Sequence, residues 1–242
     1  MNKHQEFIFS PITSILQEVV LANSGVSFAI ETYPLSEYIM QSVFLKMTGF
    51  QEQKLKCLTW EMATSDFEYR RTLLGNEDNL GECSTYNSKN KIYQRLISIL
   101  EKEIQNFKVN ENIDASMILN NSVEEIKNIF KGSTLLIWDQ NNYNYFSKNI
   151  KQIIKHNHFA NTKRNLFESS LQELYKSLYS FRNQCAHNTL SYQENLPTLN
   201  TLSNSKYLNY NYFIWFTQLI IIDKIFISLY SHFIKQTKCI EY

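Results

Sequence analysis

Residues 212–230 read YFIWFTQLIIIDKIFISLY, the one stretch of the chain with the length and apolar content of a membrane span. Asp223 and Lys224 stand at its centre, and each would cost roughly 2.5–3.5 kcal/mol in the middle of a bilayer. We therefore expect this stretch to form a helix in the protein core or at a subunit interface. We expect no association with a membrane.

The rest of the chain is poor in residues that make tight turns. It has five glycines and three prolines among 242 residues, whereas average usage is roughly 7% and 5%. Sandwiches, doubly wound sheets and phosphate-loop enzymes need many tight turns, so the composition predicts an all-α protein. The nucleotide-binding patterns G-x-x-x-x-G-K-S/T and G-x-G-x-x-G are both absent from the sequence.

Charge and cysteine content exclude several classes of protein. The formal net charge is +1, which excludes a globally basic nucleic-acid coat, so any charged binding surface is local. The four cysteines lie far apart without a C-x-x-C pair, so we expect neither a metal site nor a disulfide framework. The first residues lack the apolar stretch and cleavage site of a signal peptide, which predicts a cytoplasmic location.

Apolar periodicity predicts a bundle of about seven to eight helices. The expected helices span about 10–23, 34–48, 51–74, 89–107, 115–131, 141–157, 163–187 and 207–237. Ser10 and Pro11 are typical of a helix start, and Gly49 and Gly132 of helix ends. The polar segment 75–81 predicts a boundary between an N-terminal helical region, 1–85, and a second domain, 86–242. One continuous domain is the alternative.

One cation stands on the apolar face of the helix expected at 163–187. On a helical wheel of about 100° per residue, Arg182 falls inside the stripe formed by Leu171, Leu174, Tyr175, Leu178, Phe181 and Cys185. A guanidinium in this position is unfavourable unless it is paired, reaches solvent, or faces a cleft or a partner. The pattern therefore leaves a structural ion pair and a functional arginine as alternatives.

The residues around this arginine form a short motif. Residues 181–188 read FRNQCAHN, an R-N-x-x-A-H pattern carried by Arg182, Asn183, Ala186 and His187. The pattern resembles the signature of the HEPN superfamily, in which an arginine is followed by a polar residue and then by a histidine. The motif is also similar in its place, late in an all-helical chain and before one more apolar helix. The resemblance covers roughly residues 163–240 and implies a HEPN-like helical core in the C-terminal half.

The resemblance implies a metal-independent endoribonuclease that needs no cofactor. It implies that Arg182 and His187 are catalytic, that Asn183 supports them, and that two motifs face each other across a homodimer. Cleavage of this type leaves a 2′,3′-cyclic phosphate and a 5′-OH. The resemblance further implies a bacterial toxin or antiphage defence effector that cuts RNA, with tRNA among the candidate substrates, and an antitoxin or defence-system protein as a partner.

The residue types suit this chemistry independently of the resemblance. Histidine, with an ordinary pKa of ~6.5, acts as base or acid near neutral pH, and the arginine fork binds phosphate oxygens while staying charged. Asn183 lies four residues before His187, so we expect it to orient the histidine. Arg182 and His187 would lie about 140° apart on an unbroken helix. Either the helix distorts between them, or two copies of the chain complete one site.

A basic stretch precedes the motif helix. No acidic residue occurs between Asp139 and Glu168. The predicted RNA-binding residues there are Lys148, Lys151, Lys155, Lys163 and Arg164, among the aromatics Tyr143, Tyr145, Phe146, Phe159 and Phe167. We expect the first three lysines on one helix face, where they would follow a phosphate backbone while aromatics stack on unpaired bases. A solvated helix face is the alternative.

Competing interpretations remain open at the level of the sequence. His156 and His158 are either half of a metal site or a surface pair, and Cys185 is either a nucleophile or a buried thiol. A different class of function is a non-catalytic HEPN-like dimer that binds RNA, a nucleotide or a partner protein. A third possibility is a structural helical protein in which Arg182 forms an ion pair in the core.

Overall fold

The computed structural model describes residues 2–26, 32–75, 83–161, 164–186 and 211–240. Within these ranges it contains eleven α-helices and no β-strand, so the predicted all-α fold is confirmed. The α-helices are α1 (Lys3–Phe9), α2 (Thr13–Ala22), α3 (Tyr33–Ser65), α4 (Phe67–Gly75), α5 (Tyr86–Glu103), α6 (Val109–Asn112), α7 (Ala115–Phe130), α8 (Thr134–Trp138), α9 (Gln140–Ile153), α10 (Ser169–Ala186) and α12 (Tyr212–Ile240). Two short 3-10 helices, η1 and η3, span Asn23–Gly25 and His156–His158.

The longest helix, α3, runs through a predicted helix end. It has 33 residues, so the expected break at Gly49 is wrong. A glycine inside a helix costs only about 1 kcal/mol relative to alanine, and the buried face continues across it from Met47 to Gln51. The helix instead ends at Ser65, because the backbone of the next residue, Asp66, is extended. Asp66 Oδ1 accepts a hydrogen bond from the Tyr69 N–H at 3.0 Å and so caps α4.

Other helix boundaries also differ from the periodicity. The structure ends α9 at Ile153 and begins α10 at Ser169, whereas one helix was expected to reach 157 and the next to begin at 163. Phe159 and Phe167 form an isolated antiparallel bridge, which requires extended backbone and prevents an earlier start of α10. The short helices α1, α6 and α8 were not expected.

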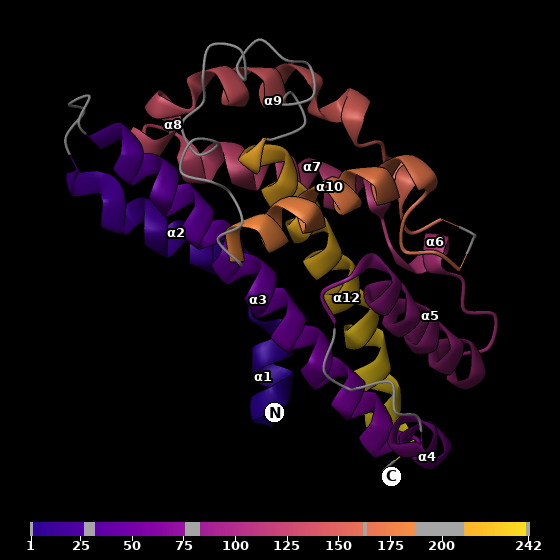
Figure 1. Ribbon diagram of the computed structural model, residues 1–242. Coiled ribbons are helices and arrows are strands. Elements are labelled where there is room, and N and C mark those ends of the chain that lie inside the picture. The colour runs from indigo at the N-terminus through magenta and orange to yellow at the C-terminus, as the bar shows by residue number, and fades with distance from the viewer. Residues whose placement is uncertain (1, 27–31, 76–82, 162–163, 187–210, 241–242) are drawn as a thin grey trace.

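The apolar helix α12 lies at the centre of the bundle (Figure 1) and packs against α3, α5, α7 and α9. Among the described residues it is the one helix long and apolar enough to cross a membrane, with α1 and α2 passing the same test only as a bent pair. However, 83% of its most apolar window is buried inside the protein, as expected for a core helix. Since the chain itself covers α12, a second copy is not needed to bury it.

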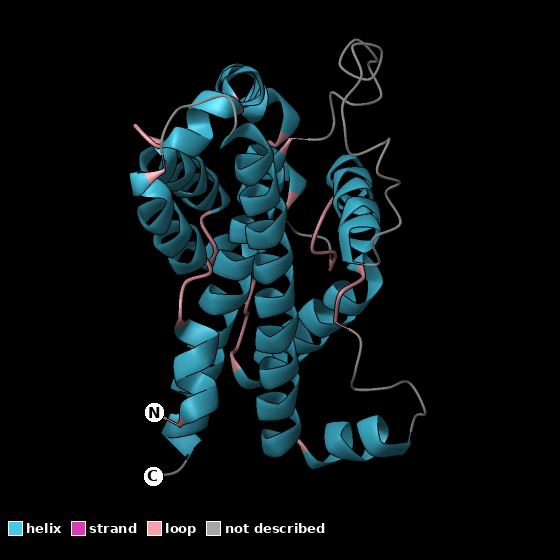
Figure 2. Ribbon diagram, turned by 60° about the vertical axis from the view of Figure 1, so that its left-hand side comes forward, coloured by secondary structure: helices cyan, strands magenta, loops and turns pink. Residues whose placement is uncertain are grey.

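The helices α3 and α12 run side by side in the same direction, towards the end of the molecule where α4 lies (Figures 1 and 2). Three contacts in register show this. The Gln51 side chain donates to the Leu219 carbonyl oxygen at 2.9 Å, Lys54 pairs with Asp223, and the Tyr230 hydroxyl lies 3.2 Å from the Glu61 carboxylate.

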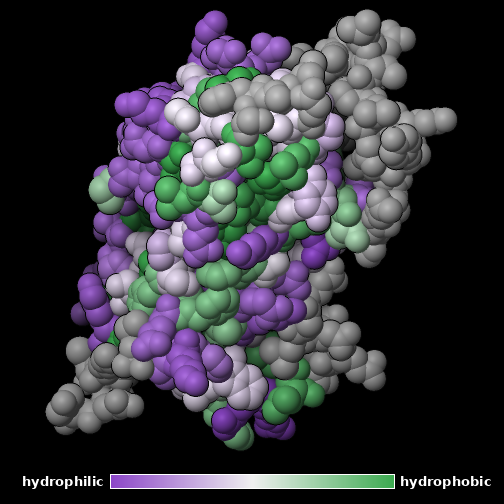
Figure 3. Space-filling view, turned by 90° about the vertical axis from the view of Figure 1, so that its left-hand side faces the viewer, coloured by the Kyte–Doolittle hydropathy of each residue, from purple (hydrophilic) through white to green (hydrophobic). Residues whose placement is uncertain are grey.

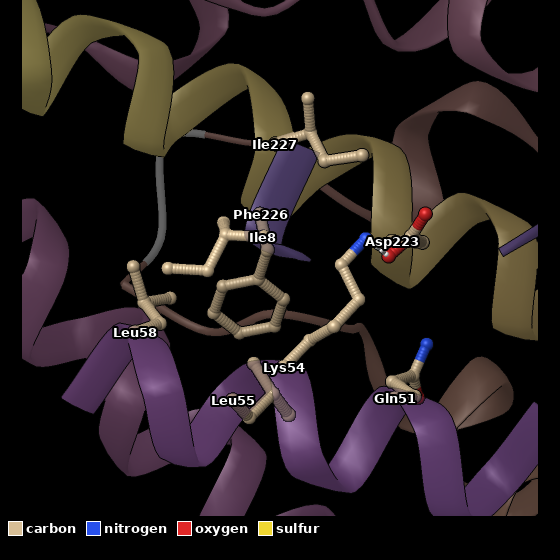
Figure 4. Close-up of a pocket in the computed structure, with 8 residues that line it drawn as sticks. All are labelled: Ile8, Gln51, Lys54, Leu55, Leu58, Asp223, Phe226 and Ile227. Atoms are coloured by element: carbon tan, nitrogen blue, oxygen red, sulfur yellow. Dashed lines mark hydrogen bonds and ion pairs between the residues drawn. The ribbon is translucent and has the colours of Figure 1, made fainter. Parts of the chain in front are cut away.

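A buried ion pair explains the charge at the centre of α12. Asp223 is 4% exposed, and its Oδ1 lies 2.5 Å from Lys54 Nζ (Figure 4). The other carboxylate oxygen accepts a hydrogen bond from the Ile12 N–H at 3.0 Å, and the ammonium also donates to the Ser10 carbonyl oxygen at 2.7 Å. Burial raises the pKa of the Asp223 carboxyl, and the Lys54 ammonium opposes that rise. The pair thus ties the α1–α2 turn to α3 and α12.

One hydrophobic core unites the N-terminal helices with the rest of the described chain. Its buried residues run from Ile8 of α1 to Phe233 of α12, and α3 packs on α5, α10 and α12. Helices on both sides of the predicted division at residue 85 therefore contribute to the same core. Residues 76–82, which hold most of the predicted boundary, lie outside the described residues.

Candidate functional site

The side chain of Arg182 lies where α10 faces α3. Its helix buries Leu171, Tyr175 and Leu178, and the arginine follows on the same face with its side chain 25% exposed. Its Nη2 lies 3.6 Å from Glu52 Oε2 of α3, and its Nη1 donates to Asn183 Oδ1 at 3.0 Å. The guanidinium is therefore both loosely paired and partly open to solvent.

The carboxylate of Glu52 is shared between two cations. Lys56, one turn further along α3, places its Nζ 2.9 Å from Glu52 Oε1, closer than Arg182 lies to Oε2. Because one carboxylate serves both cations, positive charge stays in excess around it. An anionic ligand is favoured at such a place.

A third cation, Lys89 in the first turn of α5, is almost completely buried. It is 2% exposed, and its Nζ lies 5.9 Å from the centre of the Tyr175 ring. Burial lowers the pKa of Lys89 to about 8, an effect that Cys83 and Glu52 oppose and Arg182 strengthens. Lysine is almost never buried without a partner, so this residue requires an explanation.

Lys89 was not among the predicted site residues, although its sequence context carries a signal of burial. The buried residues Ile92, Tyr93 and Leu96 stand three, four and seven positions after it, which is the spacing of one helix face. A wheel of α5 therefore places the lysine on the core face, as the wheel of α10 does for Arg182.

Lys89 and Arg182 line one small polar pocket between α3, α5, α10 and α12. Polar side chains around it include Gln51, Ser84, Tyr175 and Tyr179. The volume in which the centre of a water molecule fits inside the pocket is about 10 Å³. This is about enough for one water molecule. The site is thus suited to a single oxygen atom or a small group, and not to an enclosed organic ligand.

The structure describes two of the three motif residues. Asn183 is half-buried and accepts its hydrogen bond from Arg182, so its observed partner is the arginine. The described part of α10 ends at Ala186, and His187 lies outside the described residues. The expected orientation of His187 by Asn183, and the angle between Arg182 and His187, stay predictions.

The predicted RNA-binding lysines are exposed but do not share one helix face. Lys148 and Lys151 are exposed on α9, whereas Lys155 is exposed beyond its end, where its N–H lies 3.3 Å from His158 Nδ1. The expected stripe is therefore wrong at its third position. Arg164 is exposed and forms an ion pair with Glu101. Lys163 lies outside the described residues.

Most aromatics of this stretch belong to the core. Phe146, Phe159 and Phe167 are at most 1% exposed, so their expected stacking on bases is wrong. Tyr143 packs on Phe213 of α12 with ring centres 5.3 Å apart. Tyr145, at 37% exposed, is the one aromatic of this group that lies at the surface.

The surroundings of Cys185 and His158 do not favour a nucleophile or a metal site. Burial raises the pKa of the Cys185 thiol to about 11, which disfavours the nucleophilic thiolate. The described residues contain no group of three or more His, Cys, Asp or Glu side chains that could hold a metal ion. His158 is half-buried, and burial together with Lys155 lowers its pKa.

Comparisons with protein-family models, with curated proteins and with solved structures found no match to this chain. The fold and the site therefore define the protein only as an all-α bundle in which a partly exposed arginine and a buried lysine share a pocket. The resemblance of the R-N-x-x-A-H motif to the HEPN superfamily stays a prediction.

Proposed function

We propose that the protein is a metal-independent endoribonuclease of the HEPN type. One observation carries the proposal: the Arg182 guanidinium, five residues before His187, is held at a polar pocket with a quarter of its side chain still exposed. A purely structural arginine gains most when its charge is fully paired. Among the described residues, Arg182 has one carboxylate partner, Glu52 at 3.6 Å, which also serves Lys56.

The proposed chemistry divides between the motif residues. Arg182 binds the oxygens of the scissile phosphate and stabilises the charge that develops there. His187 removes the proton from the ribose 2′-OH or protonates the leaving 5′-oxygen. Attack of the 2′-oxygen on phosphorus breaks the bond to the 5′-oxygen and leaves a 2′,3′-cyclic phosphate and a 5′-OH. Asn183 holds the arginine through its side-chain oxygen and is a positioning residue.

The basic residues that precede α10 are proposed to bind the RNA strand on one side of the scissile phosphate at Arg182. The 3-10 helix beside Lys155 packs on α10, and Arg182 follows the first residue of α10 by thirteen positions, about 20 Å at 1.5 Å per residue. An RNA strand that contacts Lys148, Lys151 and Lys155 as well as Arg182 spans several nucleotides. This separation suits a single-stranded loop, such as those of tRNA.

The proposal includes a cytoplasmic homodimer and a toxin or antiphage defence role with an antitoxin or other partner protein. Apolar side chains gather on one face of the molecule (Figure 3). Leu21 of α2, and Leu35 and Tyr38 at the start of α3, are exposed large apolar side chains. An exposed apolar patch of this kind supports a contact with another protein.

A non-catalytic HEPN-like dimer is the second candidate, favoured by the ion pair between Arg182 and Glu52. In that function the arginine joins α10 to α3 and leaves the chemistry of the motif unused. The module would then bind RNA, a nucleotide or a partner protein without cutting.

Cleavage of RNA in EDTA separates the two functions. Purified wild type, His187→Ala and the control His156→Ala are incubated with total RNA and tRNA, and the fragment ends are mapped. We expect discrete cuts with cyclic phosphate ends from wild type and His156→Ala only. If all three proteins are inert, or all three give the same fragments, the nuclease proposal is wrong and the binding module is favoured.

A further inference from the structure

The ammonium of Lys89 is buried without the partners that a buried charge needs. Its contact at 5.9 Å is with the face of the Tyr175 ring, and within the described residues no hydrogen bond or ion pair reaches it. An ammonium carries three donors, and a group of this kind in an almost fully buried residue is strongly unfavourable unless it finds partners. Lys54 is similarly buried, but its ammonium donates to Asp223 and to the Ser10 carbonyl oxygen. A buried lysine with a structural role in this fold therefore has hydrogen-bond partners.

The surroundings of Lys89 favour an anion. Arg182 and Lys56 share one carboxylate, Glu52, which also acts on the charge of Lys89. Lys89 also lies in the first turn of the 18-residue helix α5, where the helix dipole adds positive potential. The N-cap residue Thr85 uses its side chain on the Ser88 N–H.

The shape of the pocket limits the anion to a small group. The space between Lys89 and Arg182 admits about one water-sized atom. The lysine is almost inaccessible, whereas the arginine is a quarter exposed. One oxygen of a tetrahedral oxyanion therefore fits the inner end of the pocket, and its other oxygens remain at the rim beside the guanidinium.

We propose that Lys89 and Arg182 form a binding site for one phosphate group, with Lys89 holding an inner oxygen and Arg182 the outer ones. Charge-assisted hydrogen bonds from an ammonium and a guanidinium are the usual means of holding phosphate. The assignment of that group to a phosphodiester of RNA rests on the proposed function. The phosphate site itself does not, because inorganic phosphate offers the same oxygens.

Isothermal titration calorimetry of the full chain with inorganic phosphate, at pH 7 and constant ionic strength, tests the site. The variants are Lys89→Met and Arg182→Gln, and the control is Lys91→Met, which removes an exposed lysine from the same helix. We expect saturable binding by wild type and Lys91→Met, and affinities at least about tenfold lower for the other two. Circular dichroism of each variant verifies that it is folded.

The proposal is overturned if wild type binds no phosphate at millimolar concentrations, or if Lys89→Met binds as wild type does. A 2′-O-methyl RNA oligonucleotide, which lacks the attacking hydroxyl, identifies the source of the phosphate. Weaker oligonucleotide binding by Lys89→Met than by Lys91→Met supports a phosphodiester of RNA. Unchanged oligonucleotide binding with lost phosphate binding supports the site and overturns that assignment.

The outcomes separate this inference from the proposed function. If RNA is cut in EDTA but Lys89→Met binds phosphate normally, the nuclease stands and the Lys89 site fails. If phosphate binding depends on Lys89 but no RNA is cut, the site stands and the nuclease fails.

Discussion

We expect replacement of Lys89 by methionine to stabilise the folded chain at neutral pH. Burial lowers the pKa of Lys89 to about 8 from an ordinary 10.5. A difference of about 2.5 in pKa corresponds to about 3 kcal/mol, at 1.36 kcal/mol per unit. At pH 7 the folded chain carries this unfavourable charge. Methionine keeps the length and apolar stem of the side chain, so the variant gains up to about 3 kcal/mol.

The lowered pKa of Lys89 also makes the free energy of unfolding depend on pH. Between pH 8 and 10.5 the unfolded chain keeps the Lys89 proton while the folded chain releases it, so the free energy of unfolding rises with pH. The groups that act on this lysine are Cys83, Glu52 and Arg182. For Lys89 alone, wild type gains about 2 kcal/mol between pH 7 and 9.5, and Lys89→Met loses that gain.

Urea unfolding of both proteins, in phosphate-free buffers at pH 7 and 9.5, measures these differences. The stability advantage of Lys89→Met is expected to shrink by about 2 kcal/mol over this interval. A variant that is less stable than wild type at pH 7, or an advantage that stays constant with pH, would refute the assignment of Lys89 as an unpaired buried charge.

Three further predictions concern other parts of the molecule. Lys54→Met leaves Asp223 buried without its partner, and we expect a loss of about 3–5 kcal/mol in urea unfolding at pH 7; a gain in stability would contradict the role of the pair. Asp66→Ala removes the cap of α4 and is expected to cost about 0.5–2 kcal/mol, measured by thermal unfolding, and an unchanged midpoint would exclude capping. Burial raises the pKa of Cys185 to about 11. Its alkylation by iodoacetamide at pH 8, followed by mass spectrometry, is therefore expected to be at least about tenfold slower than that of a free thiol. Equal rates would contradict the burial of the thiol.

Sequence periodicity predicted those elements whose apolar face and caps agree. The helix expected at 115–131 is observed as Ala115–Phe130, because Asp114 caps its start and Gly132 follows its end with a φ of 74°. A helix end was predicted at Gly49, whereas α3 continues to Ser65 and Asp66 caps the next helix. A glycine weakens a helix only slightly. An aspartate whose side chain accepts a hydrogen bond from the N–H three residues later caps the start of a new helix.

Part of the candidate site was predictable and part was not. The helical wheel of α10 correctly placed Arg182 on the face that packs on the core, because the face on which a residue lies follows from its spacing alone. Its partner Glu52 could not be predicted, because that contact joins helices far apart in the sequence. Lys89 was not predicted because a lysine is ordinarily a surface residue, although its spacing from Ile92 and Leu96 marks a buried position. The burial of Phe146 likewise depends on tertiary packing.

The position of α12 has a consequence for how the protein is made. The helix that α3, α5, α7 and α9 all pack against is the last of the described elements to leave the ribosome. Until then the sides of these helices that pack on α12 lack that contact. Helix α3 also lacks contacts with residues more than 160 positions away, such as the pairing of Lys54 with Asp223. Folding is thus completed only after synthesis of the core helix, and the nascent chain is a natural client for chaperones that shield apolar helices.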